Sequence, residues 1–128
     1  MIFIVDDDRS VRTSLTRLMR SAGYEARGFA AAQEYLDGTV GAGGADGAAA
    51  GGCVILDLHM PGMGGLDLQE VINRREAPLP VIVLTASEDA SMHAKALAGG
   101  AARVLKKPCD ATVLLRAVAE AIGRSEPP

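Results

Sequence analysis

The sequence predicts an α/β fold, in which one parallel sheet of five strands carries helices on both faces. Short apolar runs alternate along the chain with longer segments of helical periodicity. Most of the short runs are apolar throughout instead of at every second position, which is typical of strands buried on both faces of a sheet. At 128 residues the chain has the length of a single domain with one core of ordinary size.

The predicted strands are five short runs, four of them rich in Val, Ile or Leu. They cover residues 2–5, 24–29, 54–56, 81–84 and 103–105, and the run at 24–29 gives the weakest signal. Because helices separate the runs, consecutive strands are expected to be parallel, and the connecting helices to cover both faces of a doubly wound sheet.

Helical periodicity fills the intervals between the strands. The first helix is predicted from one apolar face, made of Val11, Leu15, Leu18, Met19 and Ala22. Gly23 ends it, since glycine is the usual residue just beyond a helix. Further helices are predicted at 31–36, 66–75 and 90–98, and the last begins after Pro108 with Asp110 as its N-cap. Asp8 is expected to cap the first helix in the same way.

A segment rich in glycine and alanine, residues 38–52, interrupts this rhythm with the sequence GTVGAGGADGAAAGG. It buries too little apolar surface to order itself, so we interpret it as a flexible connection. A phosphate-binding glycine loop would follow a strand and precede a helix, whereas this segment has the reverse neighbours. We therefore expect one domain over residues 1–123, with 124–128 as a tail or the start of a linker.

Composition excludes several classes of protein. A net charge of −3 without a cluster of Lys and Arg argues against direct nucleic-acid binding. No apolar run is long enough for a membrane span, and the N-terminal sequence MIFIVDDD lacks the features of a signal peptide. Cys53 and Cys109 do not have the spacing of a disulfide framework or a zinc site, so we expect free thiols and a cytoplasmic location.

Polar residues follow or end four of the five predicted strands, at Asp6-Asp7-Asp8, Asp57, Thr85 and Lys106-Lys107. In a parallel sheet the carboxyl ends of all strands lie along one edge, where open α/β folds bind their ligands. Neighbouring strands are only about 4.8 Å apart, so these side chains are expected to share one crevice. Strand alternation points Lys106 away from Lys107, which leaves Lys107 as the lysine of this crevice.

The charges in this crevice predict a metal ion. Asp6, Asp7 and Asp57 bring three carboxylates together, and two of them about 4 Å apart repel by roughly 4 kcal/mol at an effective dielectric of 20. One lysine cannot neutralise three carboxylates, whereas a divalent cation can supply the remainder. Hard oxygen ligands favour Mg²⁺ over zinc or copper. A carboxylate beside Mg²⁺, a hydroxyl and a lysine is an arrangement for phosphoryl transfer, with Asp57 as the nucleophile.

Four motifs, IVDDD, VILDLHMPG, VIVLTAS and VLKKP, together resemble the response-regulator receiver domain of two-component signalling systems, and the likeness runs from residue 2 to about 122. The resemblance implies a flavodoxin-like fold with strand order 2-1-3-4-5 and five helices. It also implies a Mg²⁺-dependent phosphoacceptor. Such a domain catalyses only its own phosphorylation and dephosphorylation and is not otherwise an enzyme.

Individual residues acquire roles from the same resemblance. Asp57 matches the phosphoacceptor, Asp7 a direct Mg²⁺ ligand and Asp6 an acidic partner acting mainly through water. The backbone carbonyl of His59 matches the third protein ligand of the ion. Thr85 matches a hydroxyl that moves toward the phosphoryl group, and the matching lysine is Lys107, with the bond to Pro108 expected to be cis.

Partners follow from the family as well. The phosphoryl donor would be a phosphohistidine on a sensor histidine kinase or a phosphotransfer protein. Phosphorylation would change association with a partner or with a second copy, giving a homodimer through the last two helices. No contact with a membrane is expected. Either a single-domain regulator or a receiver followed by an output domain agrees with the sequence.

The sequence departs from the family at two positions. Val104 occupies the place of a Tyr or Phe that changes rotamer with the threonine, and Cys109 that of a Phe. Our hypothesis is that Thr85 still moves but repacks smaller side chains. Two alternatives remain: a pseudo-receiver that is not phosphorylated, and a haloacid-dehalogenase-like phosphatase. The phosphatase would use Asp6 as its nucleophile and leave Asp57 without a role.

Overall fold

The computed structural model describes residues 1–39, 52–60, 62–75, 78–86 and 88–123. It contains a five-stranded parallel sheet in the order β2-β1-β3-β4-β5, which confirms the expected order. The strands are β1 (Ile2–Val5), β2 (Ala26–Phe29), β3 (Cys53–Leu56), β4 (Val81–Thr85) and β5 (Arg103–Lys106). The described helices, five in number as predicted, are α1 (Arg9–Ser21), α2 (Ala32–Thr39), α4 (Gly65–Arg74), α5 (Ala90–Ala98) and α6 (Ala111–Ala121).

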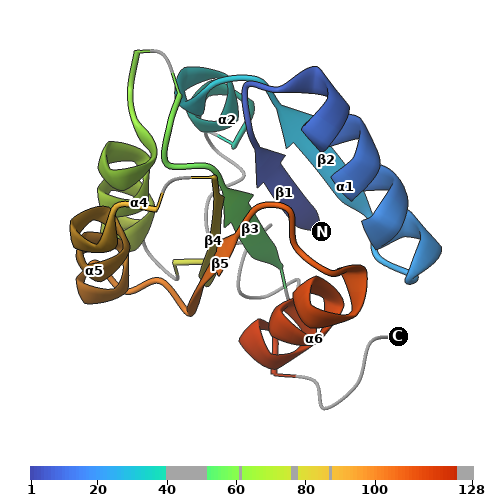
Figure 1. Cartoon of the computed structure of the whole chain (residues 1–128). Helices are drawn as coiled ribbons and strands as arrows, with labels where there is room; N and C mark the ends of the chain where they lie inside the picture. Colours follow the sequence, from blue (N-terminus) through green and yellow to red (C-terminus); the bar gives the residue numbers. More distant parts are fainter. Residues whose placement is uncertain (40–51, 61, 76–77, 87, 124–128) are drawn as a thin grey trace.

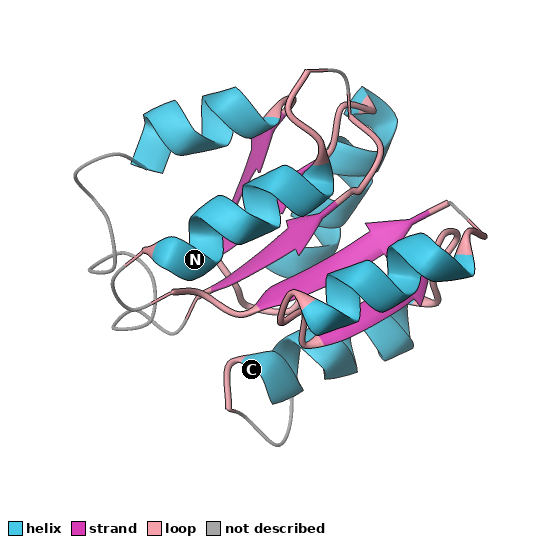
Figure 2. Cartoon of the chain, turned by 90° about the vertical axis from the view of Figure 1, so that its left-hand side faces the viewer, coloured by secondary structure: helices cyan, strands magenta, loops and turns pink. Residues whose placement is uncertain are grey.

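Helices cover both faces of the sheet, as Figure 2 shows for the cyan helices on either side of the magenta strands. On one face α1 and α6 pack their apolar sides against alternate strand residues such as Ile4 and Ile55. On the other face α2, α4 and α5 pack against the residues between them, such as Val5 and Val54. The sheet therefore separates two hydrophobic layers, because successive strand side chains point to opposite faces.

The expectation that most strands are buried on both faces is correct for the centre of the sheet. Every residue of β1, β3 and β4 is buried. It does not extend to β2 and β5, each of which includes exposed residues. Both are outermost strands and have a neighbour on one side only, so their side chains are covered less completely.

Two boundaries differ from the prediction. β2 begins at Ala26, so Tyr24 and Glu25 precede the strand. Helix α2 continues to Thr39, and the prediction that the flexible connection starts at residue 38 is therefore wrong for Gly38 and Thr39. The part of that prediction covering 40–51 lies outside the described residues, as does the predicted tail at 124–128.

Side-chain contacts account for the extra length of α2. The buried Thr39 hydroxyl donates to the carbonyl of Tyr35 at 2.7 Å and accepts a bond from Arg75 Nη1 at 2.8 Å. The Arg75 guanidinium also lies 5.5 Å from the centre of the Tyr35 ring. Contacts with a residue distant in the sequence thus extend the helix through Gly38, a residue that disfavours helix on its own.

Helix caps and thiols agree with the sequence analysis. The carboxylates of Asp8 and Asp110 accept backbone N–H bonds at the starts of α1 and α6. Cys53 is buried and Cys109 partly so, and both are free. None of the helices in the described part of the chain is long and apolar enough to span a membrane.

Candidate functional site

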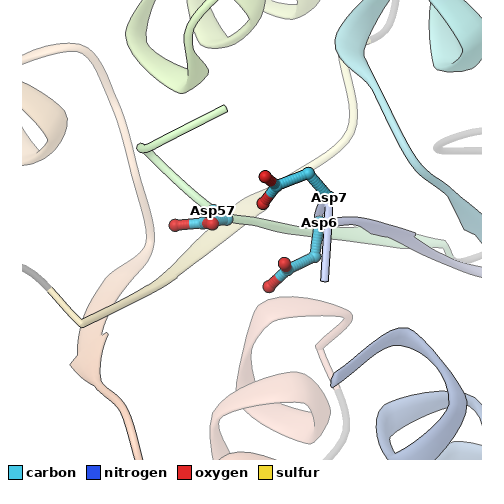
Figure 3. Close-up of side chains that lie close together, drawn as sticks. All are labelled: Asp6, Asp7 and Asp57. Atoms are coloured by element: carbon cyan, nitrogen blue, oxygen red, sulfur yellow. The ribbon is translucent and has the colours of Figure 1, made fainter. Parts of the chain in front are cut away.

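Three carboxylates meet at the carboxyl ends of two adjacent strands (Figure 3). Asp6 and Asp7 follow β1, and Asp57 follows β3, its neighbour in the sheet. One carboxylate oxygen from each lies within 4.8 Å of the others. Asp6 and Asp57 are buried, with 3% and 7% of their surface exposed, whereas Asp7 is exposed. Topology thus brings together the three acidic residues that the sequence analysis placed in one crevice.

Two hydrogen bonds with main-chain groups hold Asp57 at the end of β3. Its N–H donates to the carbonyl of Val5 at 3.0 Å, which continues the pairing of β1 with β3. The backbone N–H of His59 donates to Asp57 Oδ1 at 3.2 Å. Burial raises the pKa of the Asp57 carboxyl, and the bond from His59 and the charge of Lys107 oppose that rise.

Lys107 supplies the positive charge of the site. Its Nζ lies 2.6 Å from Asp6 Oδ2 and 3.6 Å from Asp57 Oδ2. Burial alone lowers the pKa of Lys107, but the hydrogen bond with Asp6 and the charge of Asp57 outweigh burial and raise it. The Lys107–Pro108 peptide bond is cis, as predicted. Among the charges of the site, one ammonium group faces three carboxylates.

Thr85 is the last residue of β4, and it is fully buried. Its carbonyl accepts the backbone N–H of Lys107 at 2.9 Å, so the hydroxyl-bearing residue and the lysine are joined through the main chain. His59 is exposed two residues beyond Asp57. The roles of Thr85 and of the His59 carbonyl remain predictions.

Lys106 lies outside the site, as strand alternation predicts. It is exposed and forms an ion pair with Glu88, in the connection between β4 and α5. Asp8 also lies outside, because its carboxylate caps α1 by accepting the N–H groups of Ser10 and Val11. After β1, Asp6 and Asp7 therefore belong to the site and Asp8 does not. At the end of β5, Lys107 belongs to it and Lys106 does not.

Two further residues support the backbone of the site, a role that the sequence analysis assigns to neither of them. Gly65 begins α4 beside the backbone of Asp57, where an added Cβ would lie 2.4 Å from the Asp57 carbonyl oxygen. Arg12 of α1 donates from Nη1 to the carbonyl of Asp6 at 2.9 Å. The sequence signals were weak: one of three glycines within residues 62–65, and one arginine among four in the same helix.

The three carboxylates of Asp6, Asp7 and Asp57 fit a hard divalent cation by the chemistry of their donor atoms. All three side chains offer carboxylate oxygens, which suit Mg²⁺ or Ca²⁺. Neither cysteine belongs to the group, so the site lacks the thiolate ligands that zinc and copper favour. After Lys107 offsets one charge, the remaining two match those of a divalent ion.

The model of the response regulator receiver domain matches residues 2–119. The chain belongs to the response regulator receiver family. Receiver domains are signalling domains of two-component systems, so the family predicted from the four motifs is confirmed.

Curated relatives of this receiver are longer bacterial response regulators. It is 41% identical over 122 residues to the transcriptional regulatory protein TdiR of Thauera aromatica, covering 95% of this chain and 51% of TdiR. It is 36% identical over 124 residues to the transcriptional regulatory protein FixJ of Azorhizobium caulinodans, covering 97% and 56%. The chain thus spans about half the length of these relatives.

Among solved structures, the receiver is similar to a response regulator receiver protein from Burkholderia phymatum. The TM-score is 0.81 at 35% sequence identity, with 99% of this chain and 98% of that chain covered. The fold predicted from the sequence is therefore that of a receiver over nearly its whole length.

Proposed function

We propose that this receiver is a phosphoacceptor in which Asp57 takes a phosphoryl group from a phosphohistidine on a sensor kinase or phosphotransfer protein. The observation that carries the proposal is the placement of the Asp57 carboxylate beside Lys107 and close to the carboxylates of Asp6 and Asp7. A buried carboxylate beside a lysine and two further acidic groups suits an anionic phosphoryl group together with a cation. Residues 1–123 form this unit.

In the proposed reaction, a carboxylate oxygen of Asp57 attacks phosphorus in line with the bond to the donor imidazole. A phosphorus–oxygen bond forms as the phosphorus–nitrogen bond breaks, and the bonding electrons return to the imidazole nitrogen. Lys107, 3.6 Å from Asp57 Oδ2, neutralises charge on a phosphoryl oxygen. The hydroxyl of Thr85 moves in to donate to another oxygen.

Magnesium belongs to this proposal as the cofactor. The carboxylates of Asp7 and Asp57 and the carbonyl of His59 would hold it directly, and Asp6 through water. When bound, Mg²⁺ neutralises charge on the phosphoryl oxygens. Asp6 contributes by fixing Lys107, whose Nζ lies 2.6 Å from its Oδ2.

The test is the intact mass of the protein after incubation with acetyl phosphate and Mg²⁺, for the wild type and Asp57→Ala in parallel. We expect one phosphoryl adduct on the wild type, none on Asp57→Ala and none when EDTA is present. An adduct that survives in Asp57→Ala would show that the nucleophile is another residue. Absence of any adduct on the wild type would favour a pseudo-receiver that acts without phosphorylation.

The phosphatase alternative makes a different prediction for the same variants. It requires Asp6 as the nucleophile, yet Asp6 Oδ1 accepts the N–H of Asp8 and Oδ2 pairs with Lys107. Family membership also favours a signalling domain over a hydrolase. Loss of the adduct in Asp57→Ala would exclude the phosphatase mechanism.

The proposed output of the domain is a change in association, and its proposed location is the cytoplasm. Phosphorylation changes the association of this cytoplasmic domain with a partner or with a second copy, and the domain does not itself bind nucleic acid. Sedimentation of the acetyl phosphate-treated protein, with Asp57→Ala as the control, measures self-association. A phosphorylated wild type that stays monomeric would assign the output to a partner protein.

A further inference from the structure

All four polar groups of Asp6 are engaged in hydrogen bonds. Its N–H donates to the carbonyl of Phe29 at 3.1 Å, and its Oδ1 accepts the N–H of Asp8 at 2.9 Å. Its Oδ2 pairs with Lys107 at 2.6 Å. The fourth group, the main-chain carbonyl oxygen, accepts a bond from Arg12 Nη1 at 2.9 Å. Arg12 is therefore the side chain that holds the main-chain carbonyl of Asp6 in place.

Arg12 differs from the other arginines of α1. The helix carries Arg9, Arg12, Arg17 and Arg20, and three of these are exposed. Arg12 alone among them is partly buried. The hydrogen bond to the Asp6 carbonyl offsets part of the cost of removing this guanidinium from water.

The Arg12 side chain runs past Gly28 in β2. A Cβ added to Gly28 would lie 3.5 Å from Arg12 Cδ and 3.7 Å from Arg12 Cβ. Position 28 therefore has room for a methyl group beside the aliphatic part of Arg12. The larger side chains that strands usually carry would compete for this space. This steric limit on the Arg12 side chain is independent of its hydrogen bond to Asp6.

The neighbouring Asp7 needs such support. Its side chain is exposed, and among the described residues it makes no hydrogen bond or ion pair. The direction of its carboxylate therefore depends on the backbone that precedes it. The Asp6 carbonyl and the Asp7 N–H belong to one planar peptide unit. A hydrogen bond to that carbonyl therefore fixes the orientation of the peptide plane that leads into Asp7.

We propose that Arg12 is a positioning residue for the cation site, acting through the Asp6–Asp7 peptide unit. The proposal rests on the proposed function for the identity of the cation, but not for the positioning itself. Supporting hydrogen bonds of this kind set the direction of metal ligands, and their loss typically costs 10–100-fold in metal affinity. Because the acceptor here is a main-chain atom, we expect a loss of about 10-fold.

The experiment compares Arg12→Met with Arg12→Lys and Arg17→Met. Arg17 is an exposed arginine of the same helix, so Arg17→Met removes the same charge without the bond to Asp6. Mg²⁺ affinity is measured by titration calorimetry, and hydrogen exchange at the Asp7 and Asp8 amides by NMR without metal. We expect a roughly 10-fold weaker affinity and faster exchange in Arg12→Met, partial recovery in Arg12→Lys and wild-type values in Arg17→Met.

A second pair of variants leaves Arg12 in place. Gly28→Val obstructs its aliphatic part, whereas Gly28→Ala adds only a Cβ at an ordinary contact distance of 3.5 Å. We expect weaker Mg²⁺ binding in Gly28→Val and wild-type binding in Gly28→Ala. This pair decides the question if Arg12→Met does not fold.

Three outcomes would overturn the inference. They are unchanged affinity and exchange in Arg12→Met, equal losses in Arg17→Met, and no difference between the two Gly28 variants. Absence of Mg²⁺ binding by the wild type would instead contradict the proposed function. In that case amide exchange in the metal-free protein still decides whether Arg12 positions Asp7.

Discussion

The centre of the sheet and its β5 edge are held together by different kinds of contact. At the centre, β1 and β3 are buried along their whole length, and the polar atoms of Asp6 are bonded to four different residues. At the edge, β5 has two exposed residues of four. Its charged side chains pair with exposed partners, Arg103 with Glu120 at 3.7 Å and Lys106 with Glu88.

This difference matches the two tasks that the proposed function requires of the domain. Groups that meet a phosphoryl group must be fixed before it arrives, because electrostatic stabilisation depends on preorganised charges. A surface that changes with phosphorylation needs contacts that are weak and easily exchanged, and exposed ion pairs contribute little to stability. The buried, hydrogen-bonded centre therefore suits the proposed phosphoryl transfer, and the exposed β5 edge suits transmission of the proposed signal.

The largest effect is expected at Lys107, the residue from the β5 side that reaches the centre. Lys107→Met should slow phosphorylation by acetyl phosphate by about 100-fold or more, because it removes a charge that stabilises the transition state. The time course of the intact mass measures the rate. Lys106→Met is the matched control, since Lys106 is the preceding residue and pairs with Glu88 on the surface.

Equal slowing of both lysine variants would contradict a functional difference between the centre of the sheet and its β5 edge. It would mean that the two lysines act through their charge alone, wherever they point. A wild-type rate in Lys107→Met would assign Lys107 a structural role in pairing with Asp6. Slowing confined to Lys107→Met would assign the effect to one residue, the lysine that reaches the centre of the sheet.

The next effect concerns the stability of the centre. Gly65→Ala should destabilise the fold by about 2 kcal/mol, because the new Cβ must displace the backbone of Asp57 and Leu58. Gly64→Ala is the control. Its added Cβ would lie 3.8 Å from the Leu58 carbonyl, an ordinary contact, and its cost as a poorer N-cap is under about 1 kcal/mol.

Chemical denaturation of both glycine variants measures the free energy of unfolding. Similar values for Gly65→Ala and Gly64→Ala would contradict a rigid centre, because α4 would then shift to admit the new methyl group. A loss confined to Gly65→Ala would confirm that the backbone around Asp57 resists displacement.

Much of the site could be predicted from the sequence because the strand periodicity is strong and parallel strands place their carboxyl ends together. Asp6, Asp7, Asp57 and Lys107 were placed in one crevice by that reasoning, and their side chains meet there. The fold followed from the same alternation of strands and helices.

The residues that support the site were not predictable in this way. Arg12 and Gly65 act on main-chain atoms of Asp6 and Asp57, and a main-chain atom has no sequence signature of its own. The end of α2 was missed because Gly38 disfavours a helix, whereas the bond from Arg75 to Thr39 is a contact between distant residues. Local patterns cannot reveal such contacts.

The smallest expected effect is a change in packing around Val104, which would transmit a signal away from the site. This half-buried residue packs against the core that contains α4 and α5, and it is paired with Val83 two residues before Thr85. Movement of Thr85 toward a phosphoryl group should therefore alter the packing around Val104. A valine lacks the bulk of an aromatic ring, so we expect modest repacking in place of a large change in side-chain rotamer.

The measurement is the change in backbone amide resonances when beryllofluoride is added with Mg²⁺ as a phosphoryl mimic. We expect the amides of Val104 and Leu105 to shift, and that of Ile4 in the middle of β1 to stay nearly unchanged. Asp57→Ala is the control, and it should show none of these shifts. If Val104 stays fixed while the amides around Asp57 change, the β5 edge is not the route of the signal. The difference between the centre of the sheet and its β5 edge would then concern the stability of the fold and not the transmission of a signal.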